Sequence, residues 1–200
     1  MTLALLVNLY TNISFAADYT ILALGDSLSA GYGLNKGESF PAQLEKKMLD
    51  EGHDIRMINA GVSGDTTKGG LARLNWALAD KPDMVIVELG ANDGLRGLDP
   101  ALMQDNLDKI LSQLKQRNIK VLLAGMYAPP NFGEDYGQKY NEVFPALAKR
   151  HNVTLYPFFL DGVAGIPKLN LEDGIHPTKE GIAIIVKRIL PYVLKVKEES

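Results

Sequence analysis

Five short apolar segments alternate along the chain with amphipathic stretches, and this alternation restricts the possible folds more than any other feature. Each apolar segment has the length and most of the composition of a β-strand. The segments are "TILAL" (20–24), "IRMIN" (55–59), "MVIVEL" (84–89), "KVLLAG" (120–125) and "VTLYPFF" (153–159). They predict a sheet of five strands.

The stretches between and after these strands repeat apolar residues every three or four positions, which predicts helices. The repeating residues are Phe40, Leu44 and Met48; Leu71, Leu74 and Leu78; Met103, Leu107, Ile110 and Leu114; Tyr140, Phe144 and Leu147; and Ile182, Ile185, Ile189 and Val193. Strands that alternate with helices pair in parallel through right-handed crossovers, which place helices on both faces of the sheet. We therefore expect a three-layer α/β/α sandwich, built by a single domain over residues 18–200.

Length and charge limit the classes of partner. A chain of 200 residues with 46% apolar residues is large enough to bury one core without metal or disulfide support. Its formal charge of −3 disfavours a basic surface for nucleic acid or anionic lipid. The chain has no cysteine, which excludes a cysteine nucleophile and thiolate metal sites. We expect a small-molecule substrate, no nucleic-acid partner, no stable membrane insertion and a monomer.

The first 17 residues carry no charge and contain the short apolar run "LALLVNLY". Ser14 and Ala16 stand at the small-residue positions of a secretory signal that is cleaved after Ala16. The positively charged start of such a signal is absent, so an ordinary N-terminal extension is the alternative. Polar residues interrupt the run, which makes it too short to span a membrane. We interpret residues 1–17 as a signal peptide and expect a periplasmic or secreted protein.

Small and polar residues follow each of the first three predicted strands, in "GDSLSAG", "NAGVSGDTT" and "GANDG". Ligands of an open parallel sheet bind beyond the carboxyl ends of its strands, where these segments should meet. Gly25 would let the chain turn sharply, so that Ser27 is exposed at the start of a helix. Taken alone, "GDS" is also a common turn sequence.

A serine nucleophile needs a base, and the chain has three histidines. His53 and His151 follow predicted helices and should lie at the opposite edge of the sheet. His176, in "LEDGIHPTKEG", follows the fifth strand and returns to the carboxyl edge. Asp173 can reach back to its Nδ1–H and orient the ring. A surface turn is the alternative, and so is a two-ligand metal site, although no third ligand has suitable spacing.

Serine catalysis also needs donors that face the developing oxyanion. The backbone N–H groups of Ser27 and Gly64 and the side-chain amide of Asn92 are the candidates, because all three lie in strand exits. Asn92 is also a residue type that caps turns, as are Asp65 and Asp93. Their predicted arrival at one edge of the sheet favours a joint role.

Four blocks together resemble the SGNH hydrolases, also called GDSL esterases. These blocks are "GDSLSAG", the Gly64 turn, "GAND" and "DGIHP", and the resemblance extends from about Tyr19 to Val193. It implies a flavodoxin-like sheet in the order 2-1-3-4-5 and no metal or organic cofactor. It also implies that Ser27 is the nucleophile, His176 the general base and then acid, and Asp173 its orienting partner. It further implies that Gly64 and Asn92 join the Ser27 N–H as oxyanion donors.

The resemblance implies hydrolysis of carboxylic esters and thioesters, with aryl and short-to-medium acyl esters favoured and acyl-CoA and lysophospholipids as further candidates. Five apolar residues are expected near this edge and form a candidate acyl groove: Met126, Tyr127, Pro129, Phe132 and Phe158. Simple packing of the loop explains these residues equally well. The alternatives for function are a carbohydrate O-deacetylase and a non-catalytic flavodoxin-like binding module, in which Asp26 and Asp93 would form an acidic cluster.

Overall fold

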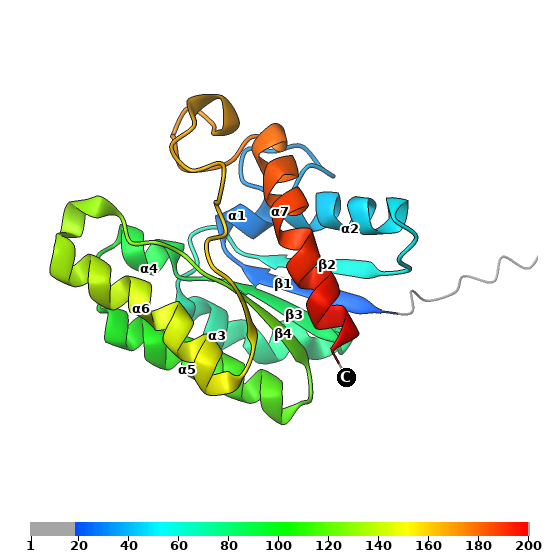
Figure 1. Ribbon diagram of the computed structural model, residues 1–200, viewed down its shortest axis with the longest axis horizontal. Helices are drawn as coiled ribbons and strands as arrows, with labels where there is room; N and C mark the ends of the chain where they lie inside the picture. Colours follow the sequence, from blue (N-terminus) through cyan, green and yellow to red (C-terminus); the bar gives the residue numbers. More distant parts are fainter. Residues whose placement is uncertain (1–18, 200) are drawn as a thin grey trace, which may run out of the picture.

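The five apolar segments form one parallel sheet in the computed structural model, which describes residues 19–199 (Figure 1). The strands are β1 (Thr20–Gly25), β2 (Arg56–Gly61), β3 (Met84–Glu88), β4 (Lys120–Ala124) and β5 (Thr154–Tyr156). Their order is β2-β1-β3-β4-β5, which confirms the expected order 2-1-3-4-5. The predicted signal segment, residues 1–17, lies outside the described residues.

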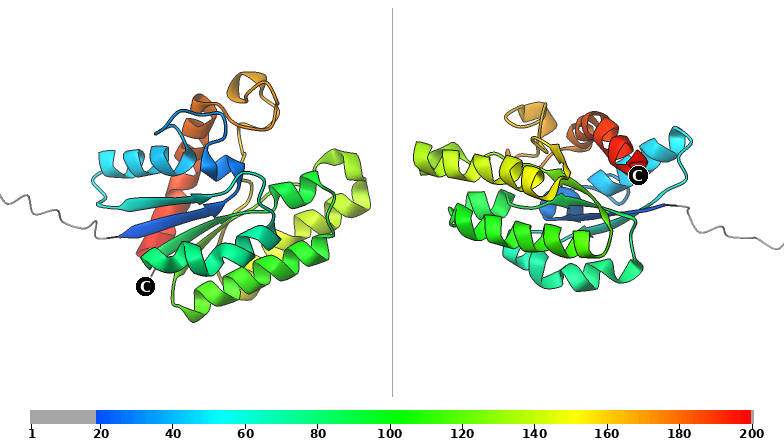
Figure 2. Two further views of the ribbon diagram at one scale, coloured as in Figure 1. Left: turned by 180° about the vertical axis from the view of Figure 1, so that it is seen from behind. Right: turned by 60° about the horizontal axis from the view of Figure 1, so that its bottom comes forward.

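Five long helices cover the two faces of the sheet and complete the predicted three layers (Figures 1 and 2). The helices α2 (Phe40–Asp50) and α7 (Lys179–Glu198) pack together on one face. The helices α3 (Thr67–Ala77), α5 (Pro100–Gln116) and α6 (Glu134–His151) pack on the other. Two short helices, α1 (Ser27–Ala30) and α4 (Ala91–Leu95), stand directly after β1 and β3.

The apolar pattern explains why the layers form. All five residues of β3 are buried, as a central parallel strand with helices on both faces requires. The repeating residues of α2, Phe40, Leu44 and Met48, have no exposed surface. Polar side chains cap the N-termini of two helices: Thr66 and Thr178 accept from N–H groups in the first turns of α3 and α7. In residues 19–199, no helix is long and apolar enough to cross a membrane.

Two boundaries differ from those predicted, and both place side chains near the carboxyl edge. β5 ends at Tyr156 rather than continuing to 159, because Pro157 has no N–H for the sheet. The chain then leaves the sheet, and Phe159 bonds back to the Gly125 carbonyl at 2.8 Å. The loop expected over 127–137 is shorter, since α6 begins at Glu134 and includes "EDYG". The acidic residues of that first turn favour a helix start.

Candidate active site

The strand exits meet at one edge of the sheet, as predicted. Ser27 is the first residue of α1, and the Asp26 carboxylate before it accepts from the Leu28 N–H at 2.9 Å, which caps this helix. Asn92 stands in the first turn of α4, and Gly64 lies in the turn that joins β2 to α3. Three connections therefore deliver the three candidate oxyanion donors to one cleft, which all of them line.

Ser27, His176 and Asp173 form a continuous chain of hydrogen bonds. The Asp173 Oδ2 lies 2.7 Å from His176 Nδ1, and His176 Nε2 lies 2.8 Å from the Ser27 Oγ. An ionised carboxylate only accepts, so the ring proton resides on Nδ1 and leaves Nε2 to accept from the serine hydroxyl. The ring is thus in the tautomer that a general base requires.

The loop before α7 holds His176 and Asp173 in this geometry. The Asp173 Oδ1 accepts from the backbone N–H groups of His176 and Ile175, at 3.0 and 2.9 Å. These backbone bonds, together with the contact to the His176 ring, lower the pKa of Asp173 to about 2. The ring of Tyr32 packs against that of His176, with 4.4 Å between the ring centroids and 36° between the ring planes. Because its pKa is lowered, Asp173 stays ionised at neutral and mildly acidic pH.

Asn92 is oriented by its contact with Asp26. Its Nδ2 donates to Asp26 Oδ2 at 2.9 Å, which uses one of the two amide hydrogens and leaves the other for a ligand in the cleft. Gly64 adopts a left-handed φ of +83°, which favours glycine in this turn. Its carbonyl accepts from Arg96 Nη2 at 2.8 Å, which ties the Gly64–Asp65 peptide to the C-terminal end of α4.

Gly25 has a different role from the one predicted. The expectation was a sharp turn, but Gly25 is the last residue of β1 and its φ is not positive. A Cβ here would collide with the Ser29 hydroxyl and the Glu88 carboxylate. Close packing of α1 against β3 therefore demands glycine at this position.

Two buried carboxyl groups, Asp26 and Glu88, lie directly behind Ser27. Burial is the largest effect, and it raises the pKa of Asp26 to about 6 against the opposing bonds from Leu28 and Asn92. Burial and the neighbouring Asp26 raise the pKa of Glu88 well above its usual value. Glu88 Oε2 accepts from the Ser29 hydroxyl at 2.7 Å, whereas Oε1 is buried without a protein partner. Burial and the neighbouring Asp26 both favour the protonated, neutral form of Glu88. The sequence does not mark Glu88 as a site residue, because it follows an apolar run within a strand.

The Glu88→Gln variant should be less sensitive to alkaline destabilisation than the wild type. A folded pKa above the unfolded value of 4.5 means that the folded state holds a proton which the unfolded state releases. Stability therefore falls as pH rises above 4.5, by up to about 1.4 kcal/mol per pH unit for one proton. Glutamine is neutral and of the same shape, so this part of the decline disappears. Urea unfolding of both proteins at several pH values measures it, and parallel pH curves would contradict the assignment.

The cleft has a volume of about 410 Å³, and its walls are mainly apolar. Four of the predicted groove residues, Met126, Tyr127, Pro129 and Phe158, line it. Phe132, the fifth predicted groove residue, is not among the residues that line this cleft. It belongs to the short helix η2 (Pro130–Phe132) and packs against Tyr136, with 5.2 Å between ring centroids. The prediction missed six further apolar lining residues, which come from several connections: Leu28, Tyr32, Ala91, Leu95, Leu160 and Ile175.

The remaining polar candidates lie elsewhere. His53 precedes β2, and His151 ends α6 with its Nε2 2.9 Å from Asp108, so both stand at the opposite edge, as predicted. Asp93 turns away from Asp26 and accepts from the Thr67 N–H and hydroxyl at 2.8 and 2.6 Å. The two aspartates therefore do not form the acidic cluster of the binding-module alternative. In the part of the chain described, no three His, Asp or Glu residues gather as a candidate metal site.

The fold and the four sequence blocks that meet at this edge define an SGNH hydrolase, a class of ester-hydrolysing enzymes. Residues 23–184 match the family described as "GDSL-like Lipase/Acylhydrolase family". The chain belongs to this family, and it is an enzyme that acts on ester bonds.

Individual relatives agree with this assignment over most of the chain. Esterase TesA of Pseudomonas aeruginosa is 44% identical over 177 residues, which are 88% of this chain and 88% of the relative. Thioesterase 1/protease 1/lysophospholipase L1 of Escherichia coli is 40% identical over 183 residues, covering 89% and 86%. The structure of esterase EstA from Pseudoalteromonas sp., inhibited by monoethylphosphonate, superimposes with a TM-score of 0.86 at 37% identity and covers 91% of this chain and 100% of that one.

Proposed function

We propose that this enzyme hydrolyses carboxylic esters and thioesters through an acyl-enzyme on Ser27. The observation that supports this most strongly is the hydrogen-bonded chain from Asp173 through His176 to Ser27, which ends in an apolar cleft. This chain supplies a nucleophile, a base and an orienting carboxylate at hydrogen-bonding distances.

In the first half of the reaction, His176 Nε2 takes the hydroxyl proton while the Ser27 Oγ attacks the carbonyl carbon of the substrate. The negative charge that develops on the carbonyl oxygen is stabilised by the N–H groups of Ser27 and Gly64 and by the amide of Asn92. His176 then returns its proton to the departing alcohol or thiol. Asp173 stabilises the imidazolium between these two transfers without taking its proton.

In the second half, water repeats the sequence. His176 deprotonates a water molecule, which attacks the acyl carbon, and the same three donors stabilise the second oxyanion. The proton then passes from His176 to Ser27 Oγ, so the carboxylic acid departs and the free enzyme returns. Every proton transfer in this scheme uses His176.

The apolar cleft supports a substrate with an acyl chain beyond acetyl. Tyr127 and Phe158 line it from two connections, and their rings pack with 4.6 Å between centroids. An acyl chain on these rings gains about 0.8 kcal/mol for each methylene that it buries. Aryl esters and short-to-medium acyl esters, and also acyl-CoA and lysophospholipids, are the substrates that we infer.

The Phe158→Ala variant should lose activity selectively against the longer esters. Loss of one wall of the cleft should lower kcat/KM for an eight-carbon p-nitrophenyl ester by about tenfold, which is the effect of one or two buried methylenes. For p-nitrophenyl acetate, kcat/KM should fall by less than about twofold, because the acetyl group is too short to contact this wall. Phe132→Ala is the matched control, because Phe132 lies outside the cleft. Equal losses for both esters would argue against an acyl groove here, and a wild-type preference for acetate alone would favour the O-deacetylase.

The proposal also includes export. Residues 1–17 are then a signal that is removed before Ala17 or Asp18, and residues 18–200 are one hydrolase domain in the periplasm or outside the cell. The uncharged apolar run of this segment and its small residues before Ala17 support this reading. N-terminal sequencing of the protein from fractionated cells tests it, and an intact Met1 in the cytoplasm would overturn it.

A further inference from the structure

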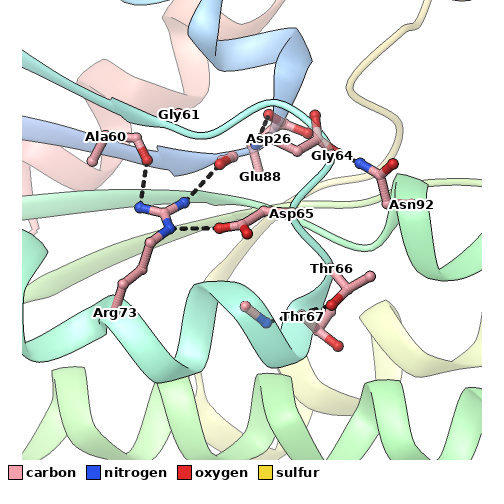
Figure 3. A network of polar contacts seen from close by, with 12 residues as sticks. Asp26, Ala60, Gly61, Gly64, Asp65, Thr66, Thr67, Arg73, Glu88 and Asn92 are labelled. Carbon is pink, nitrogen blue, oxygen red and sulfur yellow. Dashed lines mark hydrogen bonds and ion pairs between the residues drawn. The ribbon is translucent and has the colours of Figure 1, made fainter.

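Arg73 joins three backbone segments behind the cleft. It lies on α3, and each of its three guanidinium nitrogens donates to a different segment (Figure 3). Nη2 donates to the Gly25 carbonyl at 2.8 Å, Nη1 to the Ala60 carbonyl at 2.7 Å, and Nε to the Asp65 carboxylate at 2.5 Å. Only 16% of the side chain is exposed, so these bonds are largely shielded from water.

The three acceptors flank the two backbone groups that serve as oxyanion donors. Gly25 ends β1, two residues before Ser27, and Asp65 directly follows Gly64. Ala60 lies near the end of β2, which leads into the Gly64 turn. Figure 3 shows the guanidinium between these strand ends and the turn. One rigid, planar group therefore sets the distance between the peptide segments that present Ser27 N–H and Gly64 N–H.

The sequence of α3 makes room for this contact. Asp65, Gly69 and Arg73 are spaced four residues apart, so Gly69 and Arg73 lie on one face of the helix. A Cβ on Gly69 would collide with the Asp65 carboxylate. Glycine at 69 therefore lets Asp65 approach the helix and receive the Arg73 Nε–H. Asp65 alone is a residue type that caps turns. A role as a turn cap does not explain why Gly69 and Arg73 follow it at intervals of four residues.

We propose that Arg73 is a positioning residue for the oxyanion hole, which holds the Ser27 and Gly64 N–H groups at the separation that the tetrahedral intermediate requires. The inference rests on the proposed roles of Ser27 and Gly64. Backbone donors stabilise an oxyanion only when they are fixed before the reaction, because small displacements weaken the bonds formed in the transition state. Arg73 is not among the residues that line the cleft, so it acts through the segments to which it bonds.

The conservative variant Arg73→Lys tests this role. Lysine keeps the positive charge, but it lacks the planar fork and cannot span three divergent acceptors. We expect kcat for p-nitrophenyl butyrate to fall by about 10- to 100-fold, less than the loss of a whole oxyanion donor. The KM should change little. Arg117→Lys is the matched control, because Arg117 bonds to the exposed Asn75 at the opposite edge.

A second readout separates positioning from general stabilisation. An alkylboronic acid forms a tetrahedral adduct on a serine nucleophile and occupies the oxyanion hole. Its inhibition constant should rise in parallel with the loss of kcat/KM in Arg73→Lys and stay unchanged in Arg117→Lys. Wild-type kcat and boronate affinity in an Arg73→Lys protein that unfolds at a lower temperature would show a merely structural role and overturn the proposal.

Asp65→Asn covers the case in which Arg73→Lys does not fold. Asparagine retains an acceptor for Arg73 but removes the charge, so we expect a smaller loss of kcat, about three- to tenfold, again with weaker boronate binding. Wild-type values for Asp65→Asn would overturn the proposal in that case. A wild-type enzyme that the boronate does not inhibit would instead contradict the proposed role of Ser27, which distinguishes the two failures.

Discussion

Ser27→Ala should abolish acyl-enzyme formation and lower ester turnover by about 10⁴- to 10⁶-fold, the loss typical of a serine nucleophile. The substitution removes one hydroxyl, whose side-chain partner is His176. Ser27 is the first residue of α1, where alanine is compatible with the helix. The fold should therefore survive, and the loss should be confined to chemistry.

Steady-state hydrolysis of p-nitrophenyl butyrate and thermal unfolding measure this prediction together. Ser112→Ala, which removes a hydroxyl from α5 on the covering layer, is the control and should retain wild-type turnover. Turnover by Ser27→Ala within tenfold of the wild type, at an unchanged unfolding temperature, would rule out Ser27 as the nucleophile.

Asn92→Ala should lower kcat by about 10²- to 10³-fold with little change in KM, as expected for one oxyanion donor. The Asn92 amide hydrogen that faces the cleft has charge to stabilise only in the transition state. Its loss leaves the N–H groups of Ser27 and Gly64 in place, so the variant retains measurable activity. It also leaves the buried Asp26 Oδ2 without its amide donor, which costs about 1–3 kcal/mol of stability.

Single-turnover acylation kinetics locate the Asn92 effect in the chemical step. Asn75→Ala is the control, because this exposed amide on α3 contacts Arg117 and not the cleft. An unchanged acylation rate in Asn92→Ala would remove Asn92 from the oxyanion hole and assign it to the support of Asp26 alone.

Periodicity predicted the layers, because the packing of a parallel sheet imposes it on the sequence, whereas the strand order followed from the resemblance to the SGNH hydrolases. Strands covered on both faces must be apolar, as in "MVIVEL", and covering helices must repeat apolar residues, as in Phe40, Leu44 and Met48. The same regularity predicted the meeting of Ser27, Asn92 and His176, because the carboxyl ends of parallel strands share one edge.

Periodicity does not predict the contacts between segments that lie far apart in the sequence. The need for glycine at position 25 comes from the Ser29 hydroxyl and from Glu88, which is 63 residues away, and not from a local turn. Phe132 packs on Tyr136 because α6 begins earlier than the loop sequence suggested. The buried pair of Asp26 and Glu88 and the contacts of Arg73 depend on the distance between layers, which periodicity does not specify.

The most direct test of the central claim is the intact mass of the enzyme after reaction with a fluorophosphonate, followed by peptide mapping. The account predicts one adduct per chain, carried by Ser27 in the peptide that contains "GDSLSAG", and no adduct in Ser27→Ala. An unmodified wild-type enzyme that still hydrolyses esters, or an adduct on a residue other than Ser27, would contradict the account.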